Sequence, residues 1–558
     1  MPGAPGAHAD TPRGAAQGPG GPGGGEWWRS AVLYQVYLRS FADADGDGVG
    51  DLAGLLERLE HLAWLGVDAV WLSPVGPSPN ADWGYDVADY CDVHPVFGSL
   101  ADLDRVIARA AESGIRVLLD LVPNHTSDHH PWFVESRSSP RGPRRDWYVW
   151  ADPAPDGSPP NNWVSTFGGP AWTFDDASGQ YYLHNFLPEQ PDLNWWNDGV
   201  RAAFDDILRF WWDRGVAGFR IDVCTMVVKD AQLRDNPPAT EDDPWIMQMF
   251  GQRTEYNSNR PEVHDVLRRW RRVSAGYDEP RLLLGETNVE ELETLCSYYG
   301  AGDDELHLGF NFPFIEAPFE SAALSGIVAR TEALLPPGAW PVWTGSNHDV
   351  SRLATRWAGG DPARTRLALL MLLTLRGTPV LFQGDEIGLT DGELSEEQLL
   401  DPVGLRFWPH YAGRDPQRTP MPWDGGPNGG FSAPGPTPWL PMTDPAACNV
   451  AAQRADPASV LWFVRDVIAL RRGSPDLHGG DYREMAAPDG VWAWRRGEST
   501  VVALNLGDLP AALDLPGAHH VLIGTDRARD GSDAPSPVRL GPWEGVVLAA
   551  PTGGLRSP

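Results

Sequence analysis

The stretch GIRVLLDLV, residues 114–122, decides the fold of this chain. Its apolar residues face both sides of a short run, which is typical of a strand buried on both faces of a parallel sheet. A strand-like run, DAVWLSP (68–74), and a helix-like run from Leu100 to Ala111 precede it. This alternation of strand and helix predicts an α/β fold in which helices connect parallel strands.

The alternation continues in both directions along the chain. Residues 31–38 (AVLYQVYL) have the composition of a first strand, and residues 52–65 carry leucines at helical spacing. A helix-like run at 200–214 is followed by five strand-like runs: GVAGFRIDV (215–223), LLLGETN (282–288), LHLGFNF (306–312), WPVWTGSNHD (340–349) and TPVLFQGDE (378–386). Together these make eight strands, the number of a (β/α)8 TIM barrel.

Two regions depart from this alternation. Residues 127–196 are rich in Pro, Gly, Asp, Asn and Trp, and a structureless loop of that length is uncommon, so we expect an inserted subdomain (domain B) there. After a helix-like run at 460–471, short strand-like runs predict a C-terminal antiparallel β domain. The predicted organisation is a disordered Gly/Pro/Ala-rich tail at 1–25, the barrel at 26–126 and 197–472, domain B at 127–196 and the β domain at 473–558.

The composition excludes several classes of partner. The formal net charge of −32 argues against nucleic acids and anionic membranes, which select basic surfaces. Residues 1–25 lack the apolar run of a signal peptide, and no later stretch has the roughly 20 apolar residues of a membrane helix. The four scattered cysteines favour a reducing compartment. We therefore expect a cytoplasmic protein with a small-molecule substrate.

Three acidic residues lie at the carboxyl ends of three different predicted strands: Asp222, Glu286 and Asp349. In a barrel these ends converge on one pocket, where polar residues are typical of catalytic groups. Two carboxylates facing across a pocket are what glycosidic cleavage requires. Arg220 shares the strand face of Asp222, where its guanidinium either keeps a nucleophile ionised or forms a plain structural ion pair.

Four segments at these strand ends resemble the α-amylase superfamily, glycoside hydrolase family 13: DLVPNH (120–125), GFRID (218–222), GETN (285–288) and SNHD (346–349). All four occur in order, and the resemblance covers nearly everything from Trp27 onward. Within the superfamily the chain looks closest to α-glucosidases of the oligo-1,6-glucosidase type. That narrower resemblance rests on WWRSAVLYQVYLRSF (27–41), QPDLNW (190–195) and RTPMPWD (418–424).

The resemblance implies a role for each matching residue. Asp222 corresponds to the nucleophile, Glu286 to the general acid/base and Asp349 to a third carboxylate that holds sugar hydroxyls. The residues that line the subsite of the attacked sugar correspond to Asp120, His125, Arg220 and His348.

Three further positions bear on how the substrate is held. By resemblance, Tyr85 is the aromatic platform for the attacked sugar, and Asp82 closes the pocket around its nonreducing end. Arg418 either contacts a sugar or stabilises its own loop.

The resemblance implies a retaining, exo-acting α-glucosidase that hydrolyses terminal α-linked glucose from short α-glucosides through a covalent glycosyl-enzyme intermediate. The alternative is a transglycosylating or isomerising relative, of the trehalose synthase or sucrose isomerase type, with the same carboxylates. A catalytically dead, carbohydrate-binding relative is disfavoured because the three carboxylates are intact. The preference for α-1,4 or α-1,6 linkages stays open.

The segment DADGDGVGD (43–51) offers acidic side chains at alternating positions. They are spaced like the ligands of an EF-hand loop, and the candidate ligands are Asp43, Asp45, Asp47, the Val49 carbonyl and Asp51. Gly54 stands where an EF-hand has its closing glutamate, so the loop is not a true EF-hand. We predict a structural Ca²⁺ or Mg²⁺ ion, and the alternative is a turn in which Asp51 caps the next helix.

Overall fold

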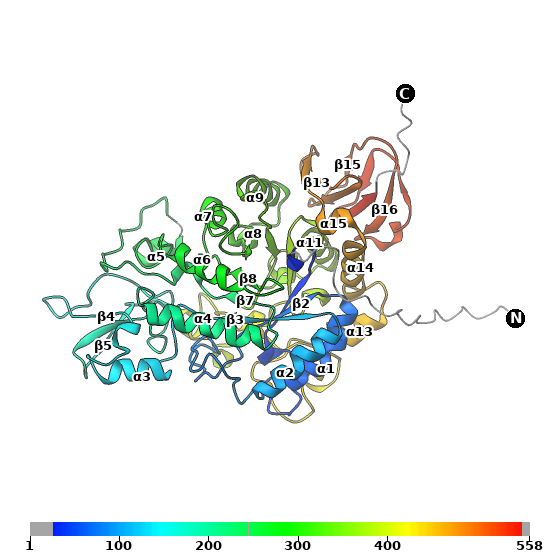
Figure 1. Cartoon of the computed structure of the whole chain (residues 1–558). Coiled ribbons are helices and arrows are strands. Elements are labelled where there is room, and N and C mark those ends of the chain that lie inside the picture. The colour runs from blue at the N-terminus through cyan, green and yellow to red at the C-terminus, as the bar shows by residue number, and fades with distance from the viewer. Residues whose placement is uncertain (1–25, 244, 550–558) are drawn as a thin grey trace.

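Eight parallel strands form the central sheet of the computed structural model, which describes residues 26–243 and 245–549 (Figure 1). Their order is β10-β11-β1-β2-β3-β7-β8-β9. The strands are β1 (Leu33–Val36), β2 (Ala69–Leu72), β3 (Arg116–Leu121), β7 (Gly218–Ile221), β8 (Leu282–Gly285), β9 (Leu308–Gly309), β10 (Val342–Thr344) and β11 (Thr378–Phe382). Because β11 pairs with β1, the sheet curves back on itself into a nearly closed barrel. The predicted barrel is confirmed, and each expected strand is found.

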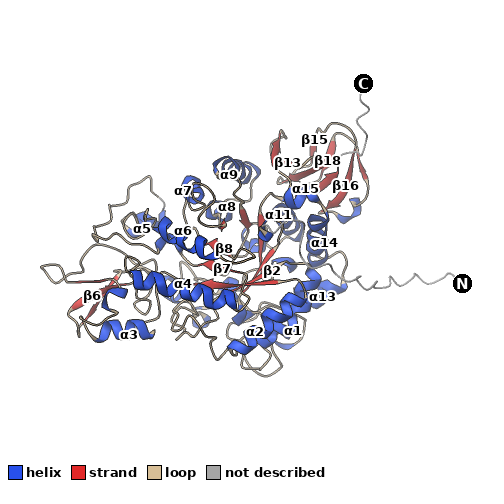
Figure 2. Cartoon of the chain, viewed as in Figure 1, coloured by secondary structure: helices blue, strands red, loops and turns tan. Residues whose placement is uncertain are grey.

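Helices alternate with these strands and lie around them (Figure 2). The principal ones are α1 (Leu52–Leu65), α2 (Leu100–Glu112), α4 (Asp198–Asp213), α6 (Val263–Ser274), α7 (Leu292–Ser297), α8 (Phe312–Glu316), α9 (Ser321–Leu334), α10 (Leu353–Arg356), α11 (Pro362–Thr374) and α14 (Val460–Gly473). Local sequence explains their limits. Asp51 caps the first turn of α1, and Gly66 ends that helix at a positive φ of 95° that favours glycine.

The interior of the barrel is filled by apolar side chains from strands around its circumference. These include Leu33, Ala69, Trp71, Leu118, Leu282, Leu308, Val342 and Val380, and Trp28 packs with them. A filled interior leaves the carboxyl ends of the strands as the place for a pocket.

Residues 127–196 contain one α-helix, a short 3-10 helix (Arg145–Trp147) and a small antiparallel sheet of their own. The elements are α3 (Pro131–Ser138), β4 (Trp150–Ala151), β5 (Trp172–Asp175) and β6 (Gln180–Leu183), and the sheet order is β4-β6-β5. A cluster of buried side chains, Trp163, Ala171, Trp172 and Leu183, packs beside this sheet. The strands are only two to four residues long, which is why no period is visible in the sequence.

The C-terminal region is antiparallel, as predicted. A six-stranded sheet has the order β12-β13-β14-β19-β16-β17, and a second sheet pairs β15 with β18. The strands are β12 (Tyr482–Met485), β13 (Val491–Arg496), β14 (Thr500–Asn505), β15 (Ala511–Leu513), β16 (His519–Gly524), β17 (Asp533–Ala534), β18 (Val538–Leu540) and β19 (Gly545–Ala549). The predicted tail at 1–25 and residues 550–558 lie outside the described residues. The boundaries proposed between the four units stay predictions.

One long excursion between β7 and α6 was not anticipated from the sequence. It carries α5 (Trp245–Phe250) and is joined to domain B by reciprocal hydrogen bonds between Asn162 and Asn236. Within the described ranges, no helix is both long and apolar enough to cross a membrane.

Candidate active site

Asp222 and Glu286 are brought together by a single guanidinium at the carboxyl end of the barrel. Asp222 directly follows β7 and Glu286 directly follows β8. Arg220, on β7, lies 2.7 Å from Asp222 Oδ1 through Nη1 and 2.9 Å from Glu286 Oε2 through Nη2. All three side chains are buried. The structure therefore brings both expected catalytic carboxylates into contact with the same guanidinium.

Each of these two carboxylates keeps one oxygen free. Oε2 of Glu286 accepts the Val223 N–H at 2.7 Å in addition to its contact with Arg220. Asp222 uses Oδ1 for Arg220. Glu286 Oε1 and Asp222 Oδ2 have no hydrogen-bond partner among the described residues. One oxygen is thus available to carry a proton and another to act as a nucleophile.

Val223 holds its N–H on Glu286 in a strained backbone conformation. Its φ of 34° lies in the left-handed region, which a β-branched residue rarely adopts. Such strain persists only where surrounding contacts enforce it, and it is concentrated at functional sites. The turn after β7 therefore helps to position Glu286 as well as Asp222.

Burial and nearby carboxylates raise the pKa of Asp222 and of Asp120, which both contact Arg220. Burial raises the pKa of Asp222, and Glu286 and Asp120 add to this while Arg220 opposes it. Burial also raises the pKa of Asp120 to about 7, against Arg220. Arg220 lowers the pKa of Asp222 and so favours its ionised form, against burial and the neighbouring carboxylates. Groups this close titrate together, and the cluster can keep a proton near neutral pH.

Asp349 has the opposite electrostatic setting. Burial by itself would raise its pKa, but His348, Arg418 and Arg414 outweigh burial and hold the pKa well below its usual range. Arg418 donates from Nη2 to Asp349 Oδ1 at 2.8 Å and from Nε to the His348 carbonyl at 2.9 Å. Asp349 thus stays ionised, and Arg418 reaches a pocket carboxylate instead of stabilising only its own loop.

Tyr85 and His348 complete the floor beside Asp120. The Tyr85 hydroxyl donates to Asp120 Oδ2 at 3.1 Å and contacts His348 Nε2, and the two rings stack 5.4 Å apart. Gln35, on β1, bonds His348 Nδ1 at 2.8 Å. Residues from β1, β3 and the loops after β2 and β10 therefore meet at one place, as predicted for strand ends.

Asp82 lies on the side of the site where domain B meets residues 401–414. Arg414 donates from Nη2 to Asp82 Oδ1 and to Asp401 Oδ1, both at 2.6 Å. The Phe167 ring of domain B lies 5.1 Å from the Arg414 guanidinium carbon. Gln190, also in domain B, donates to Asp82 Oδ2 at 3.1 Å. Three separate segments of the chain are thus joined around one buried carboxylate.

His125 is held entirely by hydrogen bonds to its neighbours. Its Nε2 contacts the Tyr85 carbonyl at 3.1 Å and lies 3.0 Å from Gln190 Nε2, and its Nδ1 lies 3.0 Å from Asn124 Nδ2. Burial lowers the pKa of His125 to about 4. The ring is therefore neutral at physiological pH.

Several residues of this site were not predicted from the sequence, among them Gln35, Arg414, Gln190 and Lys229. Gln190 lies inside the QPDLNW segment, which indicated the family resemblance but no role for this residue. Arg414 lies in an irregular segment that offers no periodic signal. Lys229 could have been found by counting, because it is the only lysine among 44 Lys and Arg residues.

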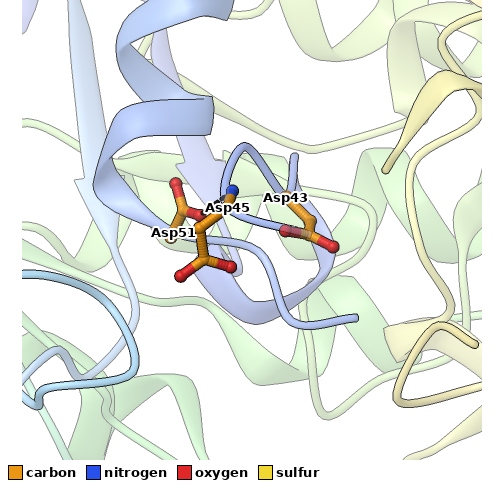
Figure 3. Close-up of side chains that lie close together, drawn as sticks. All are labelled: Asp43, Asp45 and Asp51. Carbon is orange, nitrogen blue, oxygen red and sulfur yellow. Dashed lines mark hydrogen bonds between the residues drawn. The ribbon is translucent and has the colours of Figure 1, made fainter. Parts of the chain in front are cut away.

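The acidic loop before α1 brings three of its four aspartates together. Carboxylate oxygens of Asp43, Asp45 and Asp51 lie within 4.8 Å of one another (Figure 3). Asp51 also accepts the Gly54 N–H at 2.6 Å, so it caps α1 as the alternative interpretation required. Burial and the neighbouring aspartates raise the pKa of Asp47. Backbone N–H groups offset part of the repulsion between these carboxylates, and an all-carboxylate donor set fits a hard divalent cation.

Comparison with known proteins identifies the family. Residues 35–480 match the family Alpha-amylase, described as alpha amylase, catalytic domain. A probable alpha-glucosidase of Rhizobium meliloti (strain 1021) is 44% identical, over 88% of this chain and 91% of that protein. An oligo-1,6-glucosidase of Heyndrickxia coagulans is 37% identical, over 88% of this chain and 94% of that protein.

Among solved structures, an alpha-glucosyl transfer enzyme superposes with a TM-score of 0.87 and 42% identity, covering 94% of this chain and 99% of that one. The chain belongs to the α-amylase family and is a glycoside hydrolase. The predicted resemblance is confirmed at the level of the family and of its α-glucosidase members.

Proposed function

We propose that the protein is a retaining, exo-acting α-glucosidase that removes terminal α-linked glucose from short α-glucosides. The observation that carries this proposal is the pairing of Asp222 and Glu286 on the Arg220 guanidinium, with one free oxygen on each carboxylate. A nucleophile and an acid on opposite sides of one bond are the requirements of double displacement.

In the proposed reaction, Asp222 Oδ2 attacks the anomeric carbon while Glu286 Oε1 gives its proton to the leaving oxygen. The bond to the leaving group breaks and a glycosyl ester with Asp222 forms. Glu286, now ionised, takes a proton from water, whose oxygen attacks the same carbon; the ester bond to Asp222 breaks, and glucose is released with retained configuration. Ionised Asp349 accepts hydrogen bonds from the sugar hydroxyls, and Asp120, His125, Arg220 and His348 line the same subsite.

Exo action follows from the arrangement around Asp82. Tyr85 supplies the platform for the terminal sugar, and the Asp82–Arg414 pair meets its nonreducing end, with Arg418 behind Asp349. From domain B, Gln190 donates a hydrogen bond to Asp82, and the Phe167 ring lies beside the Arg414 guanidinium. A charged pair that binds the last hydroxyls selects strongly against a chain that continues past them.

Glucosyl transfer is the second candidate function. It is favoured by the close match to an alpha-glucosyl transfer enzyme, which is as similar as the curated glucosidases. The two reactions share the glycosyl-enzyme intermediate and differ in whether water or a second hydroxyl compound resolves it.

The acidic loop is proposed to bind a structural Ca²⁺ or Mg²⁺ ion through Asp43, Asp45 and Asp51, with Asp47 and the Val49 carbonyl as further ligands. Such an ion would neutralise the carboxylate repulsion and fix the start of α1. We also infer a cytoplasmic location, supported by four cysteines that are all unpaired.

The decisive experiment follows the products of maltotriose and soluble starch over time by chromatography. Glucose should be the first product from maltotriose, and starch should be a poor substrate. Early release of oligosaccharides from starch would contradict the exo-acting proposal. Transfer products at high maltose concentration, in excess of free glucose, would favour the second candidate.

A further inference from the structure

Lys229 is the only lysine in the chain, and it is buried beside the pocket. Elsewhere the sequence uses arginine for every basic side chain. Arginine and lysine are not interchangeable where the geometry calls for a compact charge with three donors. One buried lysine in a chain that otherwise uses arginine therefore indicates a site whose geometry an arginine guanidinium does not fit.

The Lys229 ammonium contacts three oxygens from three segments. Nζ lies 2.7 Å from Asp192 Oδ2 of domain B, 2.6 Å from Asn124 Oδ1 after β3 and 3.4 Å from the Val227 carbonyl after β7. All three neighbours are acceptors, which matches the three protons of an ammonium. Burial lowers the pKa of Lys229, and Asp192 opposes this.

The contact with Asn124 determines which way that amide faces. Its oxygen must face the ammonium, so its Nδ2 must face His125 Nδ1, 3.0 Å away. An N–H pointing at Nδ1 makes Nδ1 an acceptor, and the ring proton then lies on Nε2. Nε2–H donates to the Tyr85 carbonyl at 3.1 Å, and the Gln190 amide nitrogen, 3.0 Å from Nε2, then gives its hydrogen to Asp82 Oδ2 instead. Lys229 thus fixes the orientation of the Asn124 amide, and that amide fixes the tautomer and the orientation of His125.

We propose that Lys229 is a positioning residue that sets the tautomer of His125 and holds domain B, through Asp192, at the edge of the pocket. Asp192 is tied in turn to Asn185, whose backbone and side-chain N–H groups both donate to its carboxylate. The same ammonium therefore fixes a pocket side chain and the segment of domain B behind it. This inference rests on the proposed function for its effect on catalysis.

The first test separates positioning from stability. Lys229→Met alone leaves the buried Asp192 carboxylate unpaired, which is strongly destabilising. The double variant Lys229→Met/Asp192→Asn removes both charges, and Lys229→Arg keeps a charge of the wrong shape. For the last two we expect kcat/KM per folded molecule to fall roughly 100-fold, the loss typical of a pocket group misplaced by about 1 Å.

The matched control is a partly buried ion pair away from the pocket, Arg376 with Glu332 at 2.8 Å. Arg376→Met/Glu332→Gln should alter the unfolding temperature but keep kcat/KM within about twofold, the usual scatter of independent sites. If the Lys229 double variant also kept kcat/KM within about twofold at a temperature where it is folded, the positioning role would be refuted.

The second test does not depend on activity. In ¹⁵N-histidine-labelled protein, the ring nitrogens of His125, assigned with a His125→Gln variant, should show protonated Nε2 and unprotonated Nδ1. Lys229→Met/Asp192→Asn should replace this fixed tautomer with averaged ring shifts. Unchanged shifts would overturn the proposal even if the protein hydrolyses α-glucosides. Wild-type protein with no such hydrolysis but with this response would instead refute only the proposed function.

Discussion

Replacing Asp82 with asparagine tests how the terminal sugar is recognised. Asp82 is fully buried, and its two oxygens are held by Arg414 at 2.6 Å and Gln190 at 3.1 Å. The amide keeps the shape of the side chain but removes the charge that would meet a sugar hydroxyl. A hydrogen bond to a charged group contributes about 1.5–3 kcal/mol. At 1.36 kcal/mol for each factor of ten, kcat/KM should fall about 10- to 150-fold.

The assay compares initial rates on p-nitrophenyl α-glucoside and maltotriose for the wild type and Asp82→Asn. Asp401→Asn is the matched control, because Asp401 accepts from the same Arg414 atom at the same distance of 2.6 Å. If Asp82 contacts the sugar, Asp82→Asn should lose far more activity than Asp401→Asn. Equal losses would show that Asp82 acts only by holding Arg414, and rates within about twofold of the wild type would refute its role altogether.

Four further predictions address the nucleophile, the spacing of the two carboxyl groups, the metal and a buried acid. Asp222→Asn should fold normally yet lose nearly all turnover, because an amide cannot form the glycosyl ester; a mechanism-based label attached to another residue would contradict this. The carboxyl groups of Asp222 and Glu286 should lie about 5–5.5 Å apart in a crystal structure of a substrate complex. Chelation should lower the unfolding temperature before activity is lost, since an ion at a hundredfold excess over its Kd adds about 2.7 kcal/mol of stability; immediate inactivation at an unchanged unfolding temperature would place the ion in the chemistry. Burial raises the pKa of Asp385 to about 7, so the folded state binds the proton more tightly than the unfolded state. Its contribution to the free energy of unfolding is therefore present below about pH 4 and lost as the pH rises through 7, by at most roughly 1.4 kcal/mol per pH unit. Urea unfolding of the wild type and Asp385→Asn between pH 5 and 7.5 measures this slope, and an unchanged slope in the variant would show that another group is responsible.

The parts of the site that could be predicted from the sequence are those attached to strands. A carboxylate at a strand end is visible because the strand fixes where the side chain points, and burial elsewhere in the strand would be costly. The strand-end positions of Asp222 and Glu286 follow in this way from the sequence alone. The eight strands were equally visible, because each is a short apolar run followed by a polar residue.

The parts that could not be predicted depend on contacts between irregular segments. Asp82 and Arg414 are 332 residues apart in the sequence, and Asn124 and Lys229 are 105 apart. Neither Arg414 nor Lys229 lies on a strand or a periodic helix, so no local pattern indicates which way its side chain points. The acidic loop is an intermediate case. Its spacing predicted a cluster, but the structure was needed to show that Asp51 both joins the cluster and caps α1.

Hydrolysis and transfer can diverge within one family if the residues that decide between them lie outside the strands that carry the catalytic carboxylates. The two proposed catalytic carboxylates directly follow β7 and β8, so a shift of either strand would disturb the contacts that both make with Arg220. The groups proposed to surround the terminal sugar lie largely on loops, which include the loop after β2, domain B and residues 401–414, and hydrogen bonds between Asn162 and Asn236 join the excursion after β7 to domain B. Such connections tolerate substitution far better than the barrel does. Whether water or a second sugar resolves the glycosyl-enzyme should therefore be decided in these segments, while Asp222, Glu286 and Arg220 remain the same. A change of acceptor preference produced by substitutions confined to the excursion, with an unaltered rate of glycosyl-enzyme formation, would locate that decision there.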